Sequence, residues 1–255
     1  MITPIPLAKR SLLEMAAHNN GFDRKQPDAD NWLVFTSTQC PLRIWLGLFA
    51  EGVFVVGFSQ LNVHDALSDF GAAVTFPLPA GALGGRVVTE LRAVGPLIRR
   101  AFQLSKSLPD EPLHRFEKAT AQLPKSTEAE RLVVQRVGQN IFRDGLLEYW
   151  QGRCAVTGLD TAPLLRASHI KPWADCATDA ERLDVYNGLL LAPHLDAAFD
   201  RGFITFDDDG VLVVADRLAP DARRVLGLDR PLRLRGLTAG HRNYLPWHRA
   251  RVYCG

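Results

Sequence analysis

The chain has 255 residues, of which 47% are hydrophobic and 23% charged, and its formal net charge is +2. This length suffices for one large domain or two small ones with a true apolar core, and the composition is that of an ordinary globular protein. No apolar run approaches the roughly 20 residues that cross a bilayer, and the first residues lack the unbroken apolar segment of a secretory signal. We therefore expect a cytoplasmic protein without a membrane partner.

The first hundred residues predict an α+β domain with a short antiparallel sheet. Residues 5–18 are predicted as a short helix, and strands are predicted at 32–37, 43–50 and 53–59, which are rich in Val, Ile, Phe and Trp. A tight connection at 50–52 predicts a hairpin between the last two strands. A further strand is predicted at 74–78 and a helix at 90–104, so we assign residues 1–110 to a first domain.

Three prolines (Pro109, Pro112 and Pro124) indicate a linker over residues 111–127, with a short helix near 113–122. Ser126 or Thr127 is expected to cap a helix over 128–150, where apolar residues recur at helical spacing. This helix opens a second domain over residues 128–255. Its last segment, 217–255, holds nine arginines and two aspartates, a net charge of +7 with histidine neutral. Such a segment either neutralises phosphates or is a solvated surface, and the two interpretations weigh about equally.

The four cysteines are scattered along the chain and form no CxxC pair. This pattern disfavours a disulfide framework and a zinc site made of four cysteines. We expect packing, and no structural zinc, to support the second domain. The cysteines are Cys40, Cys154, Cys176 and Cys254.

A histidine, an asparagine and a His/Asp cluster follow one another in the segments SHIKPW, YNGLLLAP and HLDAAFDRG. His169 ends a predicted strand over 164–170, and a neutral histidine with an ordinary pKa near 6.5 can accept a proton at cell pH. A lone histidine is more often structural, but Asn187, eighteen positions later, and the acidic cluster favour catalysis. Asp196 and Asp200 are four residues apart and so share one face of a helix. These are the parts of a one-metal site that cleaves phosphodiester bonds.

Residues 130–215 strongly resemble the HNH endonuclease family, in particular the branch found in many bacterial restriction-type endonucleases. The resemblance extends to the preceding helix, TEAERLVVQRVGQNIFRDGLLEYW, and to the tail AGHRNYLPWHRARVY. It implies a ββα-metal fold in the second domain. It also implies that His169 activates water and that Asn187 holds the loop between strand and helix.

The last HNH position is occupied by an aspartate rather than a histidine. The family's usual spacing places the final metal ligand nine residues after the asparagine, which is Asp196 here, whereas His194 lies seven after. We expect Asp196 and Asp200 as ligands, with His194 as a neighbour or alternative ligand; Asp200 also fits a turn cap. Hard oxygen ligands favour one Mg²⁺ or Mn²⁺ ion. Ser168 stands where relatives often carry another ligand and is a weaker donor.

Phosphate contacts are expected from four cationic or polar side chains near the site, each a weak signal alone: Lys171, Arg201, His248 and Arg249. The acidic run at 207–210 is predicted as a hairpin turn rather than a metal site.

HNH modules cut with little sequence preference, so the resemblance implies that selectivity resides in the first domain. Its aromatic residues include candidates for stacking on a flipped base, although packing in the core is the favoured interpretation. The candidates are Trp32, Phe35, Trp45, Phe49, Phe54 and Phe58.

The sequence thus predicts a metal-dependent endonuclease of double-stranded DNA that serves restriction or defence. A reader of modified cytosine in the first domain is a hypothesis from the resemblance. One site cuts one strand, so we expect a homodimer on DNA. The alternatives are a DNA-binding module with a degenerate, non-cutting site and a nonspecific, toxin-like nuclease.

Overall fold

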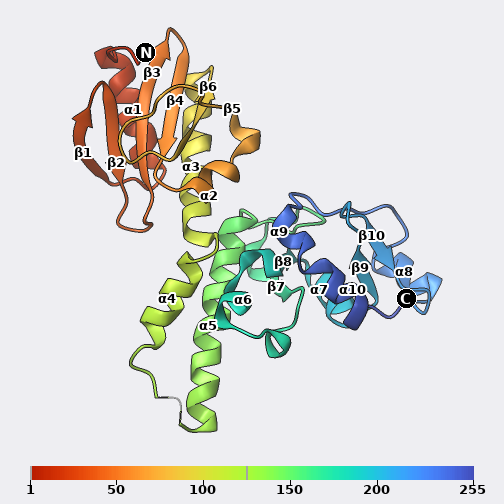
Figure 1. The fold of residues 1–255 in the computed structure, drawn as a ribbon. Helices are drawn as coiled ribbons and strands as arrows, with labels where there is room; N and C mark the ends of the chain where they lie inside the picture. The colour runs from red at the N-terminus through yellow and green to blue at the C-terminus, as the bar shows by residue number, and fades with distance from the viewer. Residues whose placement is uncertain (1, 125) are drawn as a thin grey trace. The chain divides into compact units, whose positions relative to one another are not determined.

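The computed structural model describes residues 2–124 and 126–255 (Figure 1). The chain folds as two units, Met1–Leu108 and Pro109–Gly255, called unit 1 and unit 2 below. Both units combine helices with strands, which confirms the predicted α+β class. In the described part of the chain, no helix is both long enough and apolar enough to cross a membrane.

Unit 1 is built on one antiparallel sheet with the strand order β1-β2-β3-β4-β6-β5. The central strands pair in sequence, and β6 then inserts between β4 and the short β5. Its elements are α1 (Leu7–Asn19), β1 (Arg24–Ala29), β2 (Trp32–Thr36), β3 (Arg43–Ala50), β4 (Val53–Phe58), α2 (Leu61–Asp65), η1 (Ser68–Phe70), β5 (Ala72–Ala73), β6 (Gly84–Val88) and α3 (Leu91–Ser107).

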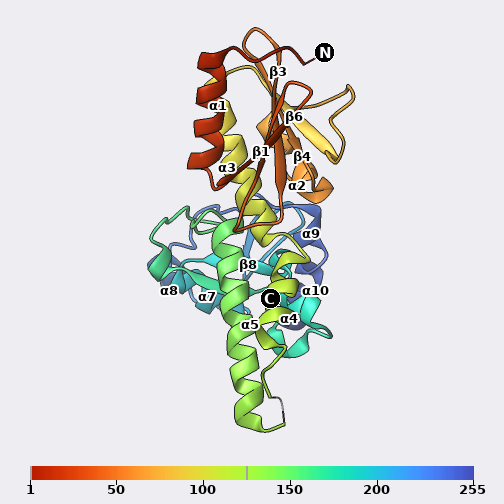
Figure 2. The same cartoon turned by 90° about the vertical axis from the view of Figure 1, so that its left-hand side faces the viewer.

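Both faces of this sheet are covered. Helices α1 and α3 lie side by side against one face (Figure 2), to which α3 contributes Leu97 and Ile98, both fully buried. The other face carries a cluster of buried side chains around Trp32 and Trp45, over which Phe76 packs. Burial on two faces explains why β2, β3 and β4 read as continuous apolar runs rather than alternating ones.

Five of the six aromatic residues considered for base stacking belong to this packing and are at most 4% exposed. The sixth, Phe49, is 38% exposed and stacks on Phe76 with ring centroids 4.9 Å apart. The structure therefore supports the core interpretation for five of these residues and leaves Phe49 at the surface.

The strand predicted at 74–78 is corrected by the structure, in which these residues form a loop and the strand is β6. Strand β6 begins with two glycines, and close packing requires both. A Cβ on Gly84 would lie 2.4 Å from the His64 ring, and one on Gly85 would lie 3.0 Å from the Val56 carbonyl oxygen. Glycine thus lets β6 approach its neighbours closely.

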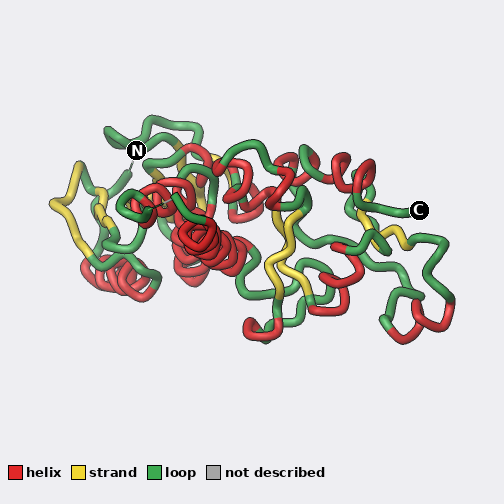
Figure 3. The backbone as a smooth tube through the Cα atoms, turned by 90° about the horizontal axis from the view of Figure 1, so that it is seen from below, coloured by secondary structure: helices red, strands yellow, loops and turns green. Residues whose placement is uncertain are grey.

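Unit 2 contains two separate two-stranded antiparallel sheets, β7 with β8 and β9 with β10, seen as two yellow pairs in Figure 3. Long loops and short helices connect them. Its elements are α4 (Glu111–Thr120), α5 (Glu128–Tyr149), η2 (Ala162–Leu164), β7 (Arg166–His169), η3 (Trp173–Asp175), α6 (Asp179–Leu183), η4 (Val185–Asn187), β8 (Gly188–Leu191), α7 (Pro193–Asp200), β9 (Ile204–Phe206), β10 (Leu212–Val214), α8 (Pro220–Val225), α9 (Ala239–Arg242) and α10 (Leu245–Arg251).

Helix α5 is the longest helix of unit 2 and packs against several of its other elements. It begins with a capping box, in which Thr127 Oγ1 accepts from the Glu130 amide at 3.2 Å and Glu130 Oε2 accepts from the Thr127 amide at 2.8 Å. One side of α5 packs on α4, which fills much of the predicted 111–127 linker, and its C-terminal half packs on β7 and β8. Phe142 and Leu146 of α5 are buried there, so α5 supports the strand that ends in His169.

Candidate active site

The chemistry-bearing residues lie on two strands and a helix. Strand β7 pairs with β8 so that Ser168 is opposite Leu189 and His169 is opposite Gly188. Helix α7 follows β8 directly and packs against β7. Residues 171–187, called the 171–187 loop below, connect the two strands.

His169 is held as a neutral base. Its Nε2 lies 2.9 Å from the Arg182 carbonyl oxygen, and because a carbonyl can only accept, Nε2 must carry the proton. Nδ1 then has a free lone pair. The ring stacks on Phe142 with centroids 3.7 Å apart, and Trp173 meets it edge-on at 5.7 Å. Burial lowers the pKa of His169 to about 4, against which the hydrogen bond to Arg182 acts weakly, so the ring is uncharged at neutral pH.

Asn187 is fully buried and its amide is saturated by the 171–187 loop. Its Oδ1 accepts from the Lys171 amide at 2.8 Å, and its Nδ2 donates to the carbonyl oxygens of Lys171 and Glu181, each at 3.1 Å. These bonds join the beginning and the end of the loop. In this arrangement Asn187 holds the loop and leaves no polar atom for the reaction.

Asp196 and Asp200 lie one helical turn apart on α7, next to Ser168, whose Oγ donates to Asp200 Oδ1 at 3.0 Å. Partial burial raises the pKa of both aspartates, and the charge of Asp200 raises that of Asp196 further. Two carboxylates and a hydroxyl therefore face one another across α7 and β7. A cation between them would relieve the repulsion between the carboxylates.

This oxygen-rich donor set fits Mg²⁺ or Mn²⁺, which prefer carboxylate and hydroxyl oxygens. His194 does not join it, because it is exposed and lies about 200° around α7 from Asp196. Within residues 2–124 and 126–255, no three His, Cys, Asp or Glu side chains are grouped as ligands. In such a site, Asp196 and Asp200 would be the charged donors and Ser168 the neutral one.

One pocket brings His169 and Asp200 together. A cavity of about 350 Å³ is lined by His169 and Asp200, with Trp173 and His248 among its other walls. A water molecule in this pocket can reach both a proton acceptor and the neighbourhood of the carboxylates. The arrangement can therefore abstract a proton beside a bound cation.

The four side chains predicted to contact phosphate differ in their exposure and in whether they already pair with other groups of the protein. Arg201 is exposed beside Asp200, whereas Lys171 pairs with Glu181 at 2.7 Å. His248 is 1% exposed, with its ring nitrogens bonded to Thr205 Oγ1 and the Phe199 carbonyl, so it packs inside unit 2.

Arg249 donates to the Phe206 carbonyl oxygen at 2.9 Å and pairs with Asp208 at 2.7 Å. It thereby fixes the acidic turn after β9. In that turn, Asp207 Oδ1 accepts from the amides of Asp209 and Val211, as a turn residue does.

Arg166 is a further cation at the site that the sequence analysis missed. It is two residues before Ser168, so alternation along β7 places both side chains on the face that α7 covers. Arg166 is exposed, and its charge lowers the pKa of Asp196. The alternation in the RASH segment is the signal that could have identified it.

Comparison with known families matches residues 154–207 to the family described as HNH endonuclease. The matched segment contains β7, the 171–187 loop, β8, α7 and β9, and so includes His169, Asn187 and the aspartates of α7. Among curated proteins, none matches the chain. The sequence resemblance is thereby confirmed for this segment: residues 154–207 form a module that matches the HNH endonuclease family, and the match indicates a nuclease.

Proposed function

We propose that the protein is a divalent-metal-dependent DNA endonuclease in which His169 is the general base. The observation that carries this proposal is the pocket shared by His169 and Asp200. In it, a hydrogen bond at Nε2 leaves Nδ1 of the histidine free to accept a proton. A neutral, oriented imidazole can act as the general base for phosphodiester hydrolysis, and paired carboxylates can hold the divalent cation that assists it.

In the reaction, His169 Nδ1 takes a proton from water as the water oxygen forms its bond to phosphorus. The bond from phosphorus to the leaving oxygen then breaks, and that oxygen takes up a proton. Asp196, Asp200 and Ser168 would hold Mg²⁺ or Mn²⁺, which when bound neutralises negative charge on the phosphate and the leaving oxygen. Arg166 and Arg201, both exposed beside the aspartates, supply further positive charge to the DNA backbone.

Nicking of a supercoiled plasmid tests this proposal. We expect nicking with Mg²⁺ or Mn²⁺, none with a chelator, and none with His169→Ala, while DNA binding by that variant persists. His194→Ala is the matched control, because His194 lies on α7 outside the pocket and its loss should leave the rate unchanged. Binding without nicking under either metal would instead identify a DNA-binding module with a degenerate site.

A restriction role with a DNA reader in unit 1 is the finer part of the proposal. Its support is the division of the chain into two units, of which unit 2 contains the whole nuclease match. Plasmids with and without cytosine methylation distinguish the cases. Cutting of the methylated plasmid alone supports a modification-dependent reader. Equal cutting of both plasmids, and of any other DNA, would favour a nonspecific nuclease.

A further inference from the structure

The side chain of Arg182 ties together the first half of the 171–187 loop. Its Nε donates to the Trp173 carbonyl at 3.2 Å, its Nη2 donates to the Cys176 carbonyl at 2.6 Å, and its Nη1 pairs with Asp179 at 2.9 Å. The planar guanidinium presents these donors in a fixed fork, so the three acceptors are held in fixed positions relative to one another.

The backbone of the same residue holds the base. The Arg182 carbonyl accepts from His169 Nε2 at 2.9 Å. It is available because α6 ends at Leu183, and the last carbonyls of a helix lack partners within the helix. The guanidinium also lies 5.9 Å from the ring centre of Trp173, which in turn meets His169 edge-on. Arg182 thus contacts His169 directly through its carbonyl and indirectly through Trp173.

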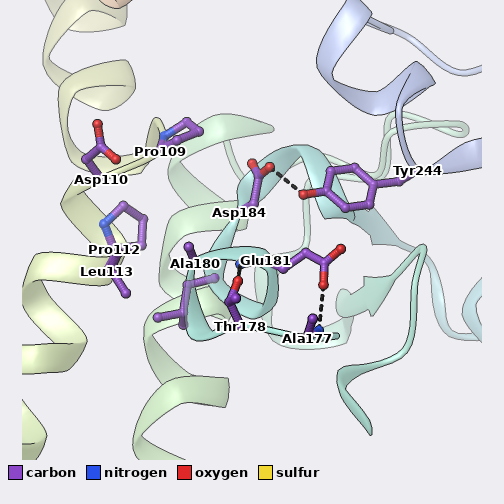
Figure 4. Close-up of a pocket in the computed structure, with 11 residues that line it drawn as sticks. Pro109, Asp110, Pro112, Leu113, Ala177, Thr178, Ala180, Glu181, Asp184 and Tyr244 are labelled. Atoms are coloured by element: carbon purple, nitrogen blue, oxygen red, sulfur yellow. Dashed lines mark hydrogen bonds between the residues drawn. The ribbon is translucent and has the colours of Figure 1, made fainter. Parts of the chain in front are cut away.

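Other bonds hold the same loop together with those of Arg182. Figure 4 shows a pocket of about 390 Å³ there, where Glu181 accepts from the Ala177 amide and Asp184 accepts from the Tyr244 hydroxyl at 2.8 Å. The first bond holds the peptide whose Cys176 carbonyl Arg182 binds, and the bonds of Asp184 and Asn187 fix the end of the loop. The Arg182 carbonyl lies between these points, where the guanidinium fork supplies three contacts of its own.

We propose that Arg182 is a positioning residue: its guanidinium orients the 171–187 loop so that its own carbonyl holds the proton of His169 on Nε2 and leaves Nδ1 bare. Without this fork the loop loses its preference for one orientation, and the proton can move to Nδ1. The histidine in that tautomer cannot accept a proton from water in the pocket. This inference rests on the proposed role of His169 as the base.

Arg182→Lys tests it, because lysine keeps the charge and loses the fork. The matched control is Arg223→Lys, since Arg223 also clamps backbone carbonyls, those of Leu218 at 2.7 Å and Ala215 at 2.9 Å. We expect kcat for nicking to fall about 10-fold or more in Arg182→Lys, with KM little changed. Arg223→Lys should keep its kcat even where the melting temperature falls equally.

Nitrogen-15 NMR of the 255-residue chain, with the His169 signal assigned through His169→Gln, reports the tautomer without any cleavage. We expect the Nε2–H form in the unmodified protein and in Arg223→Lys, and a mixture with Nδ1–H in Arg182→Lys. A retained Nε2–H tautomer in Arg182→Lys overturns the inference, as does an equal loss of kcat in both lysine variants. A shifted tautomer supports it even in a protein that fails to nick DNA, an outcome that would refute the proposed nuclease alone.

A milder pair of variants serves if Arg182→Lys does not fold. Asp179→Asn weakens the ion pair between residue 179 and the Arg182 guanidinium at an exposed position. Asp221→Asn is its control, because it weakens an ion pair with Arg224 whose partners are also three residues apart on a helix. A partial shift of the His169 tautomer in the first variant alone supports the inference. No difference between the two variants overturns it.

Discussion

Burial lowers the pKa of His169, His241 and His248 from near 6.5 to about 4 in each case. Because the folded state disfavours the charged form, this stabilisation is complete above pH 6.5 and is lost as the pH falls through about 4. We predict that the free energy of unfolding falls over this window. In His241→Gln, the fall in the free energy of unfolding between pH 6.5 and 4 should be smaller by up to about 3 kcal/mol. Denaturant titrations between pH 7.5 and 4.5 measure it, and parallel curves for both proteins would contradict the assignment.

The paired aspartates predict opposite effects on stability and on metal binding. Without metal, Asp196→Asn removes a like charge beside Asp200, so the melting temperature should stay equal or rise. The same change should abolish the shift in melting temperature caused by Mn²⁺, because it removes a ligand. Asp209→Asn, in the exposed acidic turn, is the control and should keep the shift. If only the control variant lost its stabilisation by Mn²⁺, the metal site would have to be assigned to that turn instead.

Arg166 predicts a change in how salt affects DNA binding. An arginine that contacts one phosphate releases about one counterion, so Arg166→Gln should lower the salt slope of log Kd by about 1. Affinity should fall for all sequences alike. Arg230, exposed on the loop after α8, provides the control variant. Fluorescence anisotropy across salt concentrations measures both slopes, and equal slopes in all three proteins would exclude Arg166 from the interface.

At the scale of elements, helix α5 contacts the wall of the pocket, because Gly138 packs against the Trp173 ring. A Cβ on Gly138 would lie 2.5 Å from the Trp173 ring, whereas one on Gly145 would lie 3.2 Å from a Val185 methyl. Alanine gains about 1 kcal/mol in helix propensity at either site, and crowding costs about 1–3 kcal/mol. We predict that Gly138→Ala melts near the unmodified protein but nicks DNA more slowly, because Trp173 borders His169. Gly145→Ala should nick normally; equal rates for both variants would show that the position of Trp173 does not matter.

Elements defined by local signals could be predicted from the sequence, and elements defined by distant neighbours could not. The capped helix α5 and strands β2 to β4 lie where hydrophobic periodicity and turn residues place them. Strand β1 is polar and holds Pro27, because it is an exposed edge that only its pairing with β2 defines. At the site, helical spacing was enough to pair Asp196 with Asp200. The bond from His169 to the Arg182 carbonyl needed the folded loop, since no sequence pattern specifies which carbonyl an imidazole meets.

At the scale of the whole molecule, unit 2 carries a core of its own. Four residues of this core are each at most 1% exposed: Phe142 of α5, Leu189 of β8, Phe199 of α7 and Leu165 between η2 and β7. A unit with an independent core of this size should fold alone.

We therefore predict that residues 109–255, expressed alone, unfold in one cooperative transition and nick DNA with Mg²⁺ or Mn²⁺. If unit 1 reads DNA, the fragment should cut methylated and unmethylated plasmids equally, while the full chain distinguishes them. The ratio of the two cutting rates, measured for both proteins, separates the roles. A fragment that folds and keeps the selectivity would place recognition in unit 2, beside the pocket of His169, and would leave unit 1 without a role in choosing the DNA.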